Sequence, residues 1–226
     1  MATPTLKPLL ECQKCPALRA QFRRLRVQYP EYWNRPVPAH GPEDSPLLIV
    51  GLAPGLKGAN RTGVPFVGDA SGAMLTKVLK RLNAVDQVRI TNAVKCLPRN
   101  NKPSGLEVKR CRPYFEADLF EADDQRSDQS RQASSQRDTY AAGLVRQPRH
   151  TVYFALGRVA HDEVVRAFGF KLSAVPFKHG ARHRLTKDVC LYDSYHCSRY
   201  NVQTGRMTET MLHNVLKRAL KQADIS

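Results

Sequence analysis

The chain has 226 residues, which is within the size range of a single compact domain and enough to bury a hydrophobic core. Lysine and arginine number 36 against 20 acidic residues, a formal charge of +16. This charge favours a polyanionic partner, nucleic acid before an anionic membrane surface, over a charge that serves solubility alone. No apolar run approaches the roughly 18 residues of a membrane span, and the N-terminus lacks the pattern of a signal peptide, so a cytoplasmic protein with reduced thiols is expected.

The elements predicted after residue 45 alternate between strands and helices. The first 45 residues are predicted to be irregular, with a short helix at 15–28. Short apolar runs bounded by glycine, proline or polar residues predict strands, and apolar residues at i, i+3, i+4 and i+7 predict helices. This alternation is typical of a parallel sheet in an α/β sandwich. The predicted order is strand Ser45–Leu52, helix 71–83, strand Val88–Val94, strand Thr151–Gly157, helix 158–168, strand Val189–His196 and helix 207–220.

One polar segment interrupts this alternation. Residues 121–148 contain five acids and four arginines, and almost no large apolar side chains. Such a composition is typical of an inserted surface loop that is disordered in part. We therefore predict a single domain over residues 1–226 that carries this insertion, with the positive charge on the folded remainder.

Four of the six cysteines have a spacing that suggests a shared site. Cys12 and Cys15 form a C-x2-C pair, and Cys96 and Cys111 follow far along the chain. Four thiolates suit either zinc or a [4Fe-4S] cluster, and four unrelated buried cysteines are the alternative. Zinc ribbons usually use two C-x2-C pairs, and because only one is present here, the pattern favours iron–sulfur. Cys190, inside a predicted strand, is expected to be a small core residue.

A glycine-rich stretch follows the first predicted strand, with six glycines between Gly51 and Gly72. It matches neither the P-loop pattern nor G-x-G-x-x-G, so a nucleotide site is only weakly indicated. It does follow the carboxyl end of a strand, where open α/β sheets bind ligands. Asp69 in this stretch, Asn92 and His196 each follow or end a strand and are predicted to meet in one crevice. Each also has a purely structural interpretation, as a helix cap, a turn residue and a core histidine respectively.

Several motifs together resemble the family 5 (type B) uracil-DNA glycosylases, the iron–sulfur branch of the uracil-DNA glycosylase superfamily. They are GLAPGLKGANRTGVPFVGD, TNAVKC, ALGRVAHD, HGARH and SYHCSRYNVQTGRMT, and the resemblance covers nearly the whole chain outside 121–148. Family 4 is less similar, because its first motif usually carries an acidic residue where this chain has Leu52 or Ala53. The resemblance implies a three-layer α/β/α sandwich with a central four-stranded parallel sheet. It also implies a [4Fe-4S] cluster held by Cys12, Cys15, Cys96 and Cys111.

The implied reaction is hydrolysis of the N-glycosidic bond of uracil in DNA, which leaves an abasic site without a lyase step. Hypoxanthine and modified uracils are implied as further substrates. The resemblance makes Asp69 the catalytic carboxylate, acting on water or on the sugar cation, and His196 a catalytic donor toward the base. It makes Phe66 the aromatic that stacks on the flipped base, and Asn92 the reader of the base edge.

The remaining implied contacts are to the base and to the DNA backbone. The backbone amides of Leu52 and Ala53 are expected to bind the pyrimidine O2. The loop that follows His196 is expected to enter the minor groove. The implied DNA-binding residues are Asn60, Arg61, Thr62, Arg199 and Tyr200, the first three either meeting phosphate or ordering their own loop.

One departure from the family pattern is Cys197, which stands where the last motif usually has proline. Loss of the fixed proline φ angle predicts a less rigid loop after His196. A non-catalytic iron–sulfur or zinc module that binds nucleic acid is the main alternative function, and a nucleotide-binding enzyme is disfavoured because no phosphate motif is present. Retention of Asp69, Asn92 and His196 together favours the enzyme, which we expect to act on DNA as a monomer.

Overall fold

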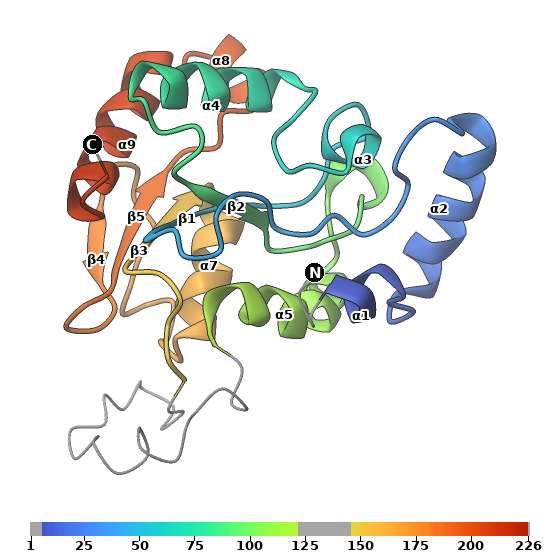
Figure 1. Ribbon diagram of the computed structural model, residues 1–226, viewed down its shortest axis with the longest axis horizontal. Coiled ribbons are helices and arrows are strands. Elements are labelled where there is room, and N and C mark those ends of the chain that lie inside the picture. Colours follow the sequence, from blue (N-terminus) through green and yellow to red (C-terminus); the bar gives the residue numbers. More distant parts are fainter. Residues whose placement is uncertain (1–5, 122–145, 226) are drawn as a thin grey trace.

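A computed structural model describes residues 6–121 and 146–225 of the chain. Its described part is built on a five-stranded sheet with the order β2-β1-β3-β5-β4 (Figure 1). Four of these strands are parallel, and the short edge strand β4 runs antiparallel to β5. The strands are β1 (Leu47–Gly51), β2 (Arg89–Asn92), β3 (Val152–Leu156), β4 (Arg182–Arg184) and β5 (Cys190–Ser194).

Helices cover both faces of this sheet and complete three layers (Figure 1). The helices are α1 (Leu6–Leu10), α2 (Pro16–Gln28), α3 (Ala59–Thr62), α4 (Ala70–Arg81), α5 (Gly105–Leu119), α7 (Arg158–Ala167), α8 (Arg199–Gln203) and α9 (Glu209–Gln222), with a 3-10 turn η1 (Arg99–Asn101). Helices α4 and α9 pack on the face that carries Leu47 and Ile49, and α5 and α7 pack on the face that carries Leu48 and Val50. Because successive strand residues point to opposite faces, β1 needs apolar side chains at every position, which its sequence LLIV supplies.

The predicted α/β/α architecture is confirmed, with one addition to the sheet. The four predicted strands correspond to β1, β2, β3 and β5, and the predicted helices correspond to α2, α4, α7 and α9. The sheet has five strands rather than the four that were implied, because β4 pairs with β5. Its sequence, Arg182–Arg184, is polar and largely exposed, so no apolar pattern signals it.

Helix α5 is also absent from the sequence prediction, although its start carries a recognisable signal. Ser104 accepts a hydrogen bond from the backbone N–H of Glu107, and Glu107 accepts one from the backbone N–H of Ser104. This capping box has the S-x-x-E spacing that marks helix N-termini. The predicted insertion at 121–148 falls mostly on residues 122–145, which lie outside the described residues.

The parallel register brings four strand ends to one edge of the sheet. Gly51 at the end of β1 is paired with Asn92 at the end of β2. Leu156 at the end of β3 is paired with Ser194 at the end of β5. The glycine-rich loop after β1 and the loop that begins with Tyr195 after β5 therefore start from the same edge of the sheet, with β3 between their strands.

Candidate active site and cysteine site

A cavity of about 670 Å³ opens at this edge of the sheet. Its volume is within the range of small-molecule sites, about 300–1,000 Å³. Most of the lining comes from the glycine-rich loop, and the rest comes from the ends of β2 and β5 and from η1. All the predicted catalytic and substrate-binding residues line it, namely Leu52, Ala53, Phe66, Asp69, Asn92 and His196.

Gly51 leaves the space in which Phe66 and Asn92 approach each other. A Cβ atom at residue 51 would lie 2.4 Å from Asn92 Oδ1 and 2.5 Å from Phe66 Cε2, closer than real Cβ contacts. Phe66 itself has a φ angle of +55°, in the left-handed region that bulky residues rarely adopt. An aromatic ring and an amide are thus held side by side, at the cost of local backbone strain.

The two carboxylate oxygens of Asp69 have different surroundings. Oδ1 accepts a hydrogen bond of 2.9 Å from the backbone N–H of Gly72 and so caps helix α4. Oδ2 lies over two glycines of the loop: a Cβ atom would be 2.3 Å from it at Gly58 and 3.2 Å from it at Gly55. Asp69 is therefore both a helix cap and a residue of the cavity, and the glycines make room for its second oxygen.

His196 lies near Phe66, with 6.1 Å between their ring centroids. Burial lowers the pKa of His196, and the opposing effect of the Asp69 charge does not reverse this shift. The imidazole is consequently neutral near pH 7 and offers one N–H donor. Gly157 has a φ angle of +97°, and a Cβ atom there would lie 3.3 Å from His196 Cβ, so glycine at this position accommodates the histidine.

Asn60, Arg61 and Thr62 order the glycine-rich loop. Asn60 is fully buried and donates to Asn34 Oδ1 at 2.9 Å, while its own Oδ1 has no hydrogen-bond partner among the described residues. Because the amide is buried, the contacts that the structure gives Asn60 are those that order its own loop. Arg61 donates to the carbonyl of Lys57, and Thr62 donates to the carbonyl of Val64, although Arg61 is also exposed.

Arg199 and Tyr200 lie on the short helix α8, where both are exposed; the exposed fraction of Tyr200 is 72%. Cys197 connects His196 to this helix and is buried. Burial raises the pKa of the Cys197 thiol to about 12, and the protonated thiol donates to the carbonyl of Ser71 at 3.4 Å. This contact ties the loop to the first turn of α4, whereas the lower rigidity predicted for a loop without proline stays a prediction.

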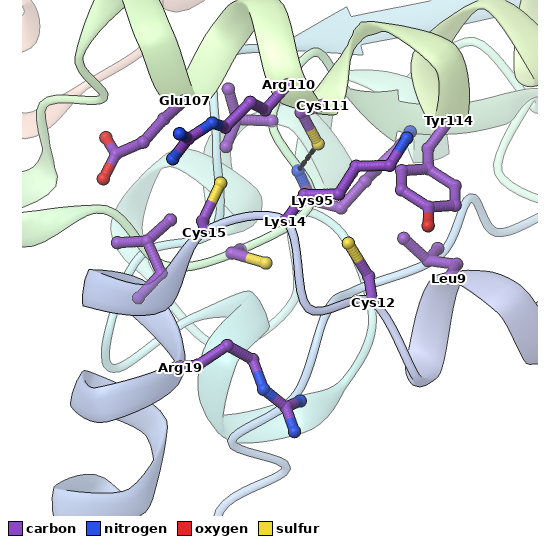
Figure 2. A pocket seen from close by; sticks show the side chains of 13 residues that line it. Leu9, Cys12, Lys14, Cys15, Arg19, Lys95, Glu107, Arg110, Cys111 and Tyr114 are labelled. Carbon is purple, nitrogen blue, oxygen red and sulfur yellow. Dashed lines mark hydrogen bonds between the residues drawn. The ribbon is translucent and has the colours of Figure 1, made fainter.

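Cys12, Cys15, Cys96 and Cys111 line one hollow between the N-terminal segment, the loop after β2 and helix α5. Figure 2 shows Cys12, Cys15 and Cys111 around this hollow. The other two cysteines are buried elsewhere and do not contribute to its lining. These four cysteines, from three segments far apart in sequence, therefore share the lining of one hollow.

Among the described residues, no three of these four thiols have their sulfur atoms within 4.8 Å of one another. Four thiolates at about 2.3 Å from one zinc ion have sulfur atoms about 3.8 Å apart. Among the described residues, the one group of histidine, cysteine and acidic side chains close enough to chelate a single ion lies at β5 and contains no cysteine.

Burial raises the pKa of Cys111 to about 11, and burial together with the neighbouring thiols raises the pKa of Cys96 further. Lys14, Arg19 and Arg110 supply positive charge around the hollow (Figure 2).

A buried polar network lies between this cysteine site and Asn92, and the sequence pattern does not indicate it. Lys95 is only 1% exposed; its ammonium group contacts both Thr91 and Asp118, and its backbone N–H donates to Cys111 Sγ at 3.2 Å. Thr91 in turn donates to Asp118 at 2.6 Å. Thr91, which precedes Asn92, and Lys95, which follows it, are therefore both held by contacts with Asp118. Through its backbone N–H, Lys95 also contacts Cys111 of the cysteine site.

A second buried network surrounds Asp193 of β5, which is fully buried. Its carboxylate lies 2.7 Å from His161 Nδ1 and 2.9 Å from His183 Nε2, and it accepts from the backbone N–H of Lys178 at 3.2 Å. Ligand atoms around a tetrahedral ion at about 2.0–2.1 Å would be about 3.3 Å apart, so these shorter distances indicate hydrogen bonds. The other ring nitrogen of His161 lies 2.8 Å from the carbonyl of Val175, so both nitrogens donate and the ring is an imidazolium.

The ion pair between His161 and Asp193 leads to a testable prediction about the free energy of unfolding. Replacing Asp193 with alanine leaves the His161 charge buried without its partner, and we expect the free energy of unfolding to fall by about 3–5 kcal/mol at pH 6. Burial by itself lowers the pKa of His161, but the hydrogen bond and charge of Asp193 outweigh burial and the net shift is upward. A raised pKa stabilises the folded protein fully below about pH 6.5, and this contribution is lost as pH rises through the folded-state pKa.

Urea denaturation of the wild type and Asp193→Ala, carried out from below pH 6.5 to above the folded-state pKa of His161, measures the effect. Asp188→Ala is the matched control, because Asp188 is an exposed acid just before β5 and its removal should change stability by no more than about 0.5 kcal/mol. A difference between wild type and Asp193→Ala that is the same at every pH would contradict the ion pair.

Comparison with known proteins places this chain in a class. The family model described as "Uracil DNA glycosylase superfamily" matches residues 38–125. The type-5 uracil-DNA glycosylase of Thermus thermophilus is 36% identical over 97% of this chain and 97% of that protein. That of Mycobacterium leprae is 35% identical over 95% of this chain and 92% of that protein. A type-4 uracil-DNA glycosylase from Sulfurisphaera tokodaii, at 36% identity, matches over only 49% of this chain.

The class that the fold and the comparisons define is thus the uracil-DNA glycosylase superfamily. Within it, the chain belongs to the type-5 uracil-DNA glycosylase family, as the sequence motifs predict. A membrane-crossing helix is absent from the described segments, since none of their helices has the required length and apolar character.

Proposed function

We propose that this protein excises uracil from DNA by hydrolysing the bond between N1 of the base and C1′ of the sugar, which leaves an abasic site. The observation that carries the proposal is the convergence of Phe66, Asp69, Asn92 and His196 on one cavity. These side chains come from three separate segments, namely the glycine-rich loop, the end of β2 and the loop after β5, and the cavity is large enough to hold a nucleobase with part of its sugar. We assign the activity to a single domain that acts as a monomer on DNA in the cytoplasm.

Recognition of the base requires it to leave the stack, because the glycosidic bond is not accessible inside a duplex. The Phe66 ring offers an apolar face for a flipped base, and the Asn92 amide beside it can accept from uracil N3–H and donate to O4. Cytosine presents the opposite donor and acceptor at these atoms. The resulting mismatch costs about 1–3 kcal/mol for each buried group left unpaired.

Bond cleavage needs stabilisation of opposite charges on the two fragments. As the C1′–N1 bond breaks, its electron pair goes to the base and positive charge develops on the sugar. The free oxygen of Asp69 can stabilise the sugar cation and take a proton from the attacking water, whose oxygen bonds to C1′. A neutral His196, together with the amides of Leu52 and Ala53, can donate hydrogen bonds to the negative charge on the base. No lysine is needed in this scheme, in line with an enzyme that lacks a lyase step.

Hypoxanthine and modified uracils are included in the proposed substrate range. The cavity has a volume of about 670 Å³, and its remaining lining includes the small residues Gly55, Ala59, Ser71 and Ser198. A purine or a substituted pyrimidine would therefore meet fewer steric barriers than in a pocket closed around uracil.

A groove beside the cavity offers a path for the DNA backbone. It has a volume of about 570 Å³, runs between α2 and η1 and shares Leu56 and Asn101 with the lining of the base cavity. Arg24 and Arg99 line it, are exposed and form no ion pair within the described residues. Unpaired guanidinium groups in a groove that continues from the base site fit the phosphates next to a flipped nucleotide. Arg61 at the glycine-rich loop, and Arg199 and Tyr200 as a wedge on α8, would contact the DNA on other sides.

Removal of the two groove arginines should weaken DNA binding in a salt-dependent way. Each phosphate contact contributes about 0.7 to the slope of log affinity against log salt for single strands, and about 0.9 for duplex. Arg24→Gln with Arg99→Gln should therefore lower this slope by about 1.4–1.8 in fluorescence anisotropy titrations. The control pair Arg23→Gln with Lys109→Gln removes the same charge from exposed positions outside the groove. Equal changes in both pairs would argue against the groove as the backbone path.

We further propose that the four clustered cysteines hold a [4Fe-4S] cluster. The common hollow and the basic residues Lys14, Arg19 and Arg110 support this fit, as does the finding that no three of the four described thiols lie within 4.8 Å of one another. When bound, the cluster would supply cross-linking of distant segments rather than chemistry on the substrate. Its ligands would join the N-terminal segment to the loop after β2 and to α5, and so hold in place the backbone that carries Asn92.

The decisive test is incubation of the purified protein with duplex DNA that contains a single uracil, followed by alkali to cleave abasic sites. Strand scission only after alkali is the expected result, and scission without alkali would show a lyase step. Absence of scission with uracil, hypoxanthine and hydroxymethyluracil substrates would instead favour the second candidate, a non-catalytic module that binds nucleic acid. The basic groove and the cysteine site are compatible with such a module, whereas the four convergent side chains of the cavity favour the enzyme.

A further inference from the structure

The loop between α7 and β4 is anchored to strand β5 just before His196. The Asp193 carboxylate accepts from His161 on α7, from His183 on β4 and from the backbone N–H of Lys178 in the loop. The backbone N–H of Gly180 donates to the carbonyl of Asp193 at 2.8 Å. Two buried charges and several hydrogen bonds therefore fix this loop against the strand.

His179 projects from this anchored loop onto Tyr195, the residue that precedes His196. Nδ1 of His179 accepts from the backbone N–H of Tyr195 at 3.0 Å. The two rings stack with centroids 4.9 Å apart and an interplanar angle of 16°. Burial and the positive charge of Arg218 lower the pKa of His179, and the more weakly opposing Asp193 does not reverse this shift. The ring is therefore neutral near pH 7, as an acceptor at Nδ1 requires.

The backbone of His196 is also held on its other side. Asn201 on α8 donates from its side-chain amide to the carbonyl of His196 at 2.8 Å. One side-chain contact thus precedes His196 and another follows it, and Gly157 lies against its Cβ atom. The position of the ring in the cavity is set by groups that do not themselves line the cavity.

We infer that His179 is a positioning residue for the reaction, which holds the backbone N–H of Tyr195 so that the His196 ring points at the base. The inference rests on the proposed function, since His196 has its catalytic role there. A displacement of the His196 ring by about 1 Å would weaken its hydrogen bond to the leaving base more than the binding of undamaged parts of the DNA. His179 should consequently affect the rate of bond cleavage rather than the affinity for DNA.

The test compares two substitutions of similar size. His179→Asn retains a polar side chain whose oxygen can accept from the Tyr195 N–H, whereas His179→Leu retains bulk without an acceptor. We expect His179→Leu to lower the single-turnover rate of uracil release by about 10- to 100-fold, with unchanged affinity for abasic-site duplex. His179→Asn should recover most of this loss. The ring resonances of His196 in NMR spectra should shift in the leucine variant and return toward wild type in the asparagine variant.

Controls separate positioning from folding and from the proposed function itself. His40→Leu, at an exposed histidine outside the cavity, should leave the rate unchanged. Thermal unfolding verifies that each variant is folded, and His179→Ala replaces the leucine variant if the latter is not. A wild-type rate in His179→Leu, or equal losses in both variants with unshifted His196 resonances, would overturn the inference. If the wild-type protein releases no uracil, the proposed function fails, while the NMR comparison still decides whether His179 sets the position of His196.

Discussion

Replacing Asp69 with asparagine is expected to lower the single-turnover rate of uracil release by about 10²- to 10⁴-fold while leaving the fold intact. The loss corresponds to removal of a charge and a general base from the transition state. Asparagine is chosen over alanine because Asp69 also caps α4 through Gly72, and asparagine caps helices about as well as aspartate. Alanine would add a stability loss of about 1 kcal/mol and confuse the two effects. Single-turnover kinetics with an excess of enzyme, together with thermal unfolding, measures both quantities.

A second variant checks that the position of the carboxylate matters as well as its charge. In Gly58→Ala the new methyl group would lie 2.3 Å from Asp69 Oδ2, so the carboxylate has to move although its charge is retained. We expect a rate loss in this variant too, with DNA affinity close to that of the wild type. An unchanged rate in Asp69→Asn would refute the assignment of Asp69 to the chemistry and leave it a helix cap alone.

Loss of a single cysteine ligand is expected to destabilise the whole protein. Cys96→Ser should abolish incorporation of a [4Fe-4S] cluster, and its effect should be a large part of the total stability of a domain, about 5–15 kcal/mol. The reason is that in the proposed assignment the four thiolates would tie together, through the cluster, the N-terminal segment, the loop after β2 and helix α5. Iron and acid-labile sulfide in anaerobically purified protein should amount to about four of each per chain in the wild type.

Cys190→Ala is the matched control, because Cys190 is a buried cysteine of β5 outside the hollow. It should retain the full content of iron and sulfide and lose only the stability expected for a small cavity. Zinc without sulfide in the wild-type protein would overturn the cluster assignment. Full iron content in Cys96→Ser would show that Cys96 is not a ligand.

Much of the fold follows from local patterns in this chain. Strand β1 is fully buried on both faces, so its unbroken apolar run is itself the signal, and α4 and α9 carry apolar residues at helical spacing. Strand β4 lacks such a signal, because Arg182–Arg184 is polar and is a strand only through its pairing with β5. Helix α5 carries its signal in the Ser104–Glu107 capping box rather than in its apolar residues.

The sequence grouped the residues that line the candidate cavity, but it did not predict their geometry. Asp69, Asn92 and His196 could be grouped because parallel strands end at one edge of a sheet. Their environment could not be derived in this way. The division of the two Asp69 oxygens between helix cap and cavity depends on how close Gly58 and Gly72 approach, which is a matter of packing. Asn60 likewise belongs to a motif that suggests phosphate contact, yet Asn34 and the surrounding loop bury it.

By itself, the sequence determined the class of fold, the family, the four-cysteine pattern and the residue types that line the candidate site. Each of these follows from local hydrophobic periodicity, from short motifs or from the order of residues along the chain. Only the tertiary structure decided that Gly58 leaves room for Asp69 and Gly51 for Phe66. It also decided that the four thiols share one hollow and that Asp193 anchors the loop that carries His179. The physical reason is that close packing and buried hydrogen bonds join residues far apart in sequence, so their geometry exists only once the chain has folded.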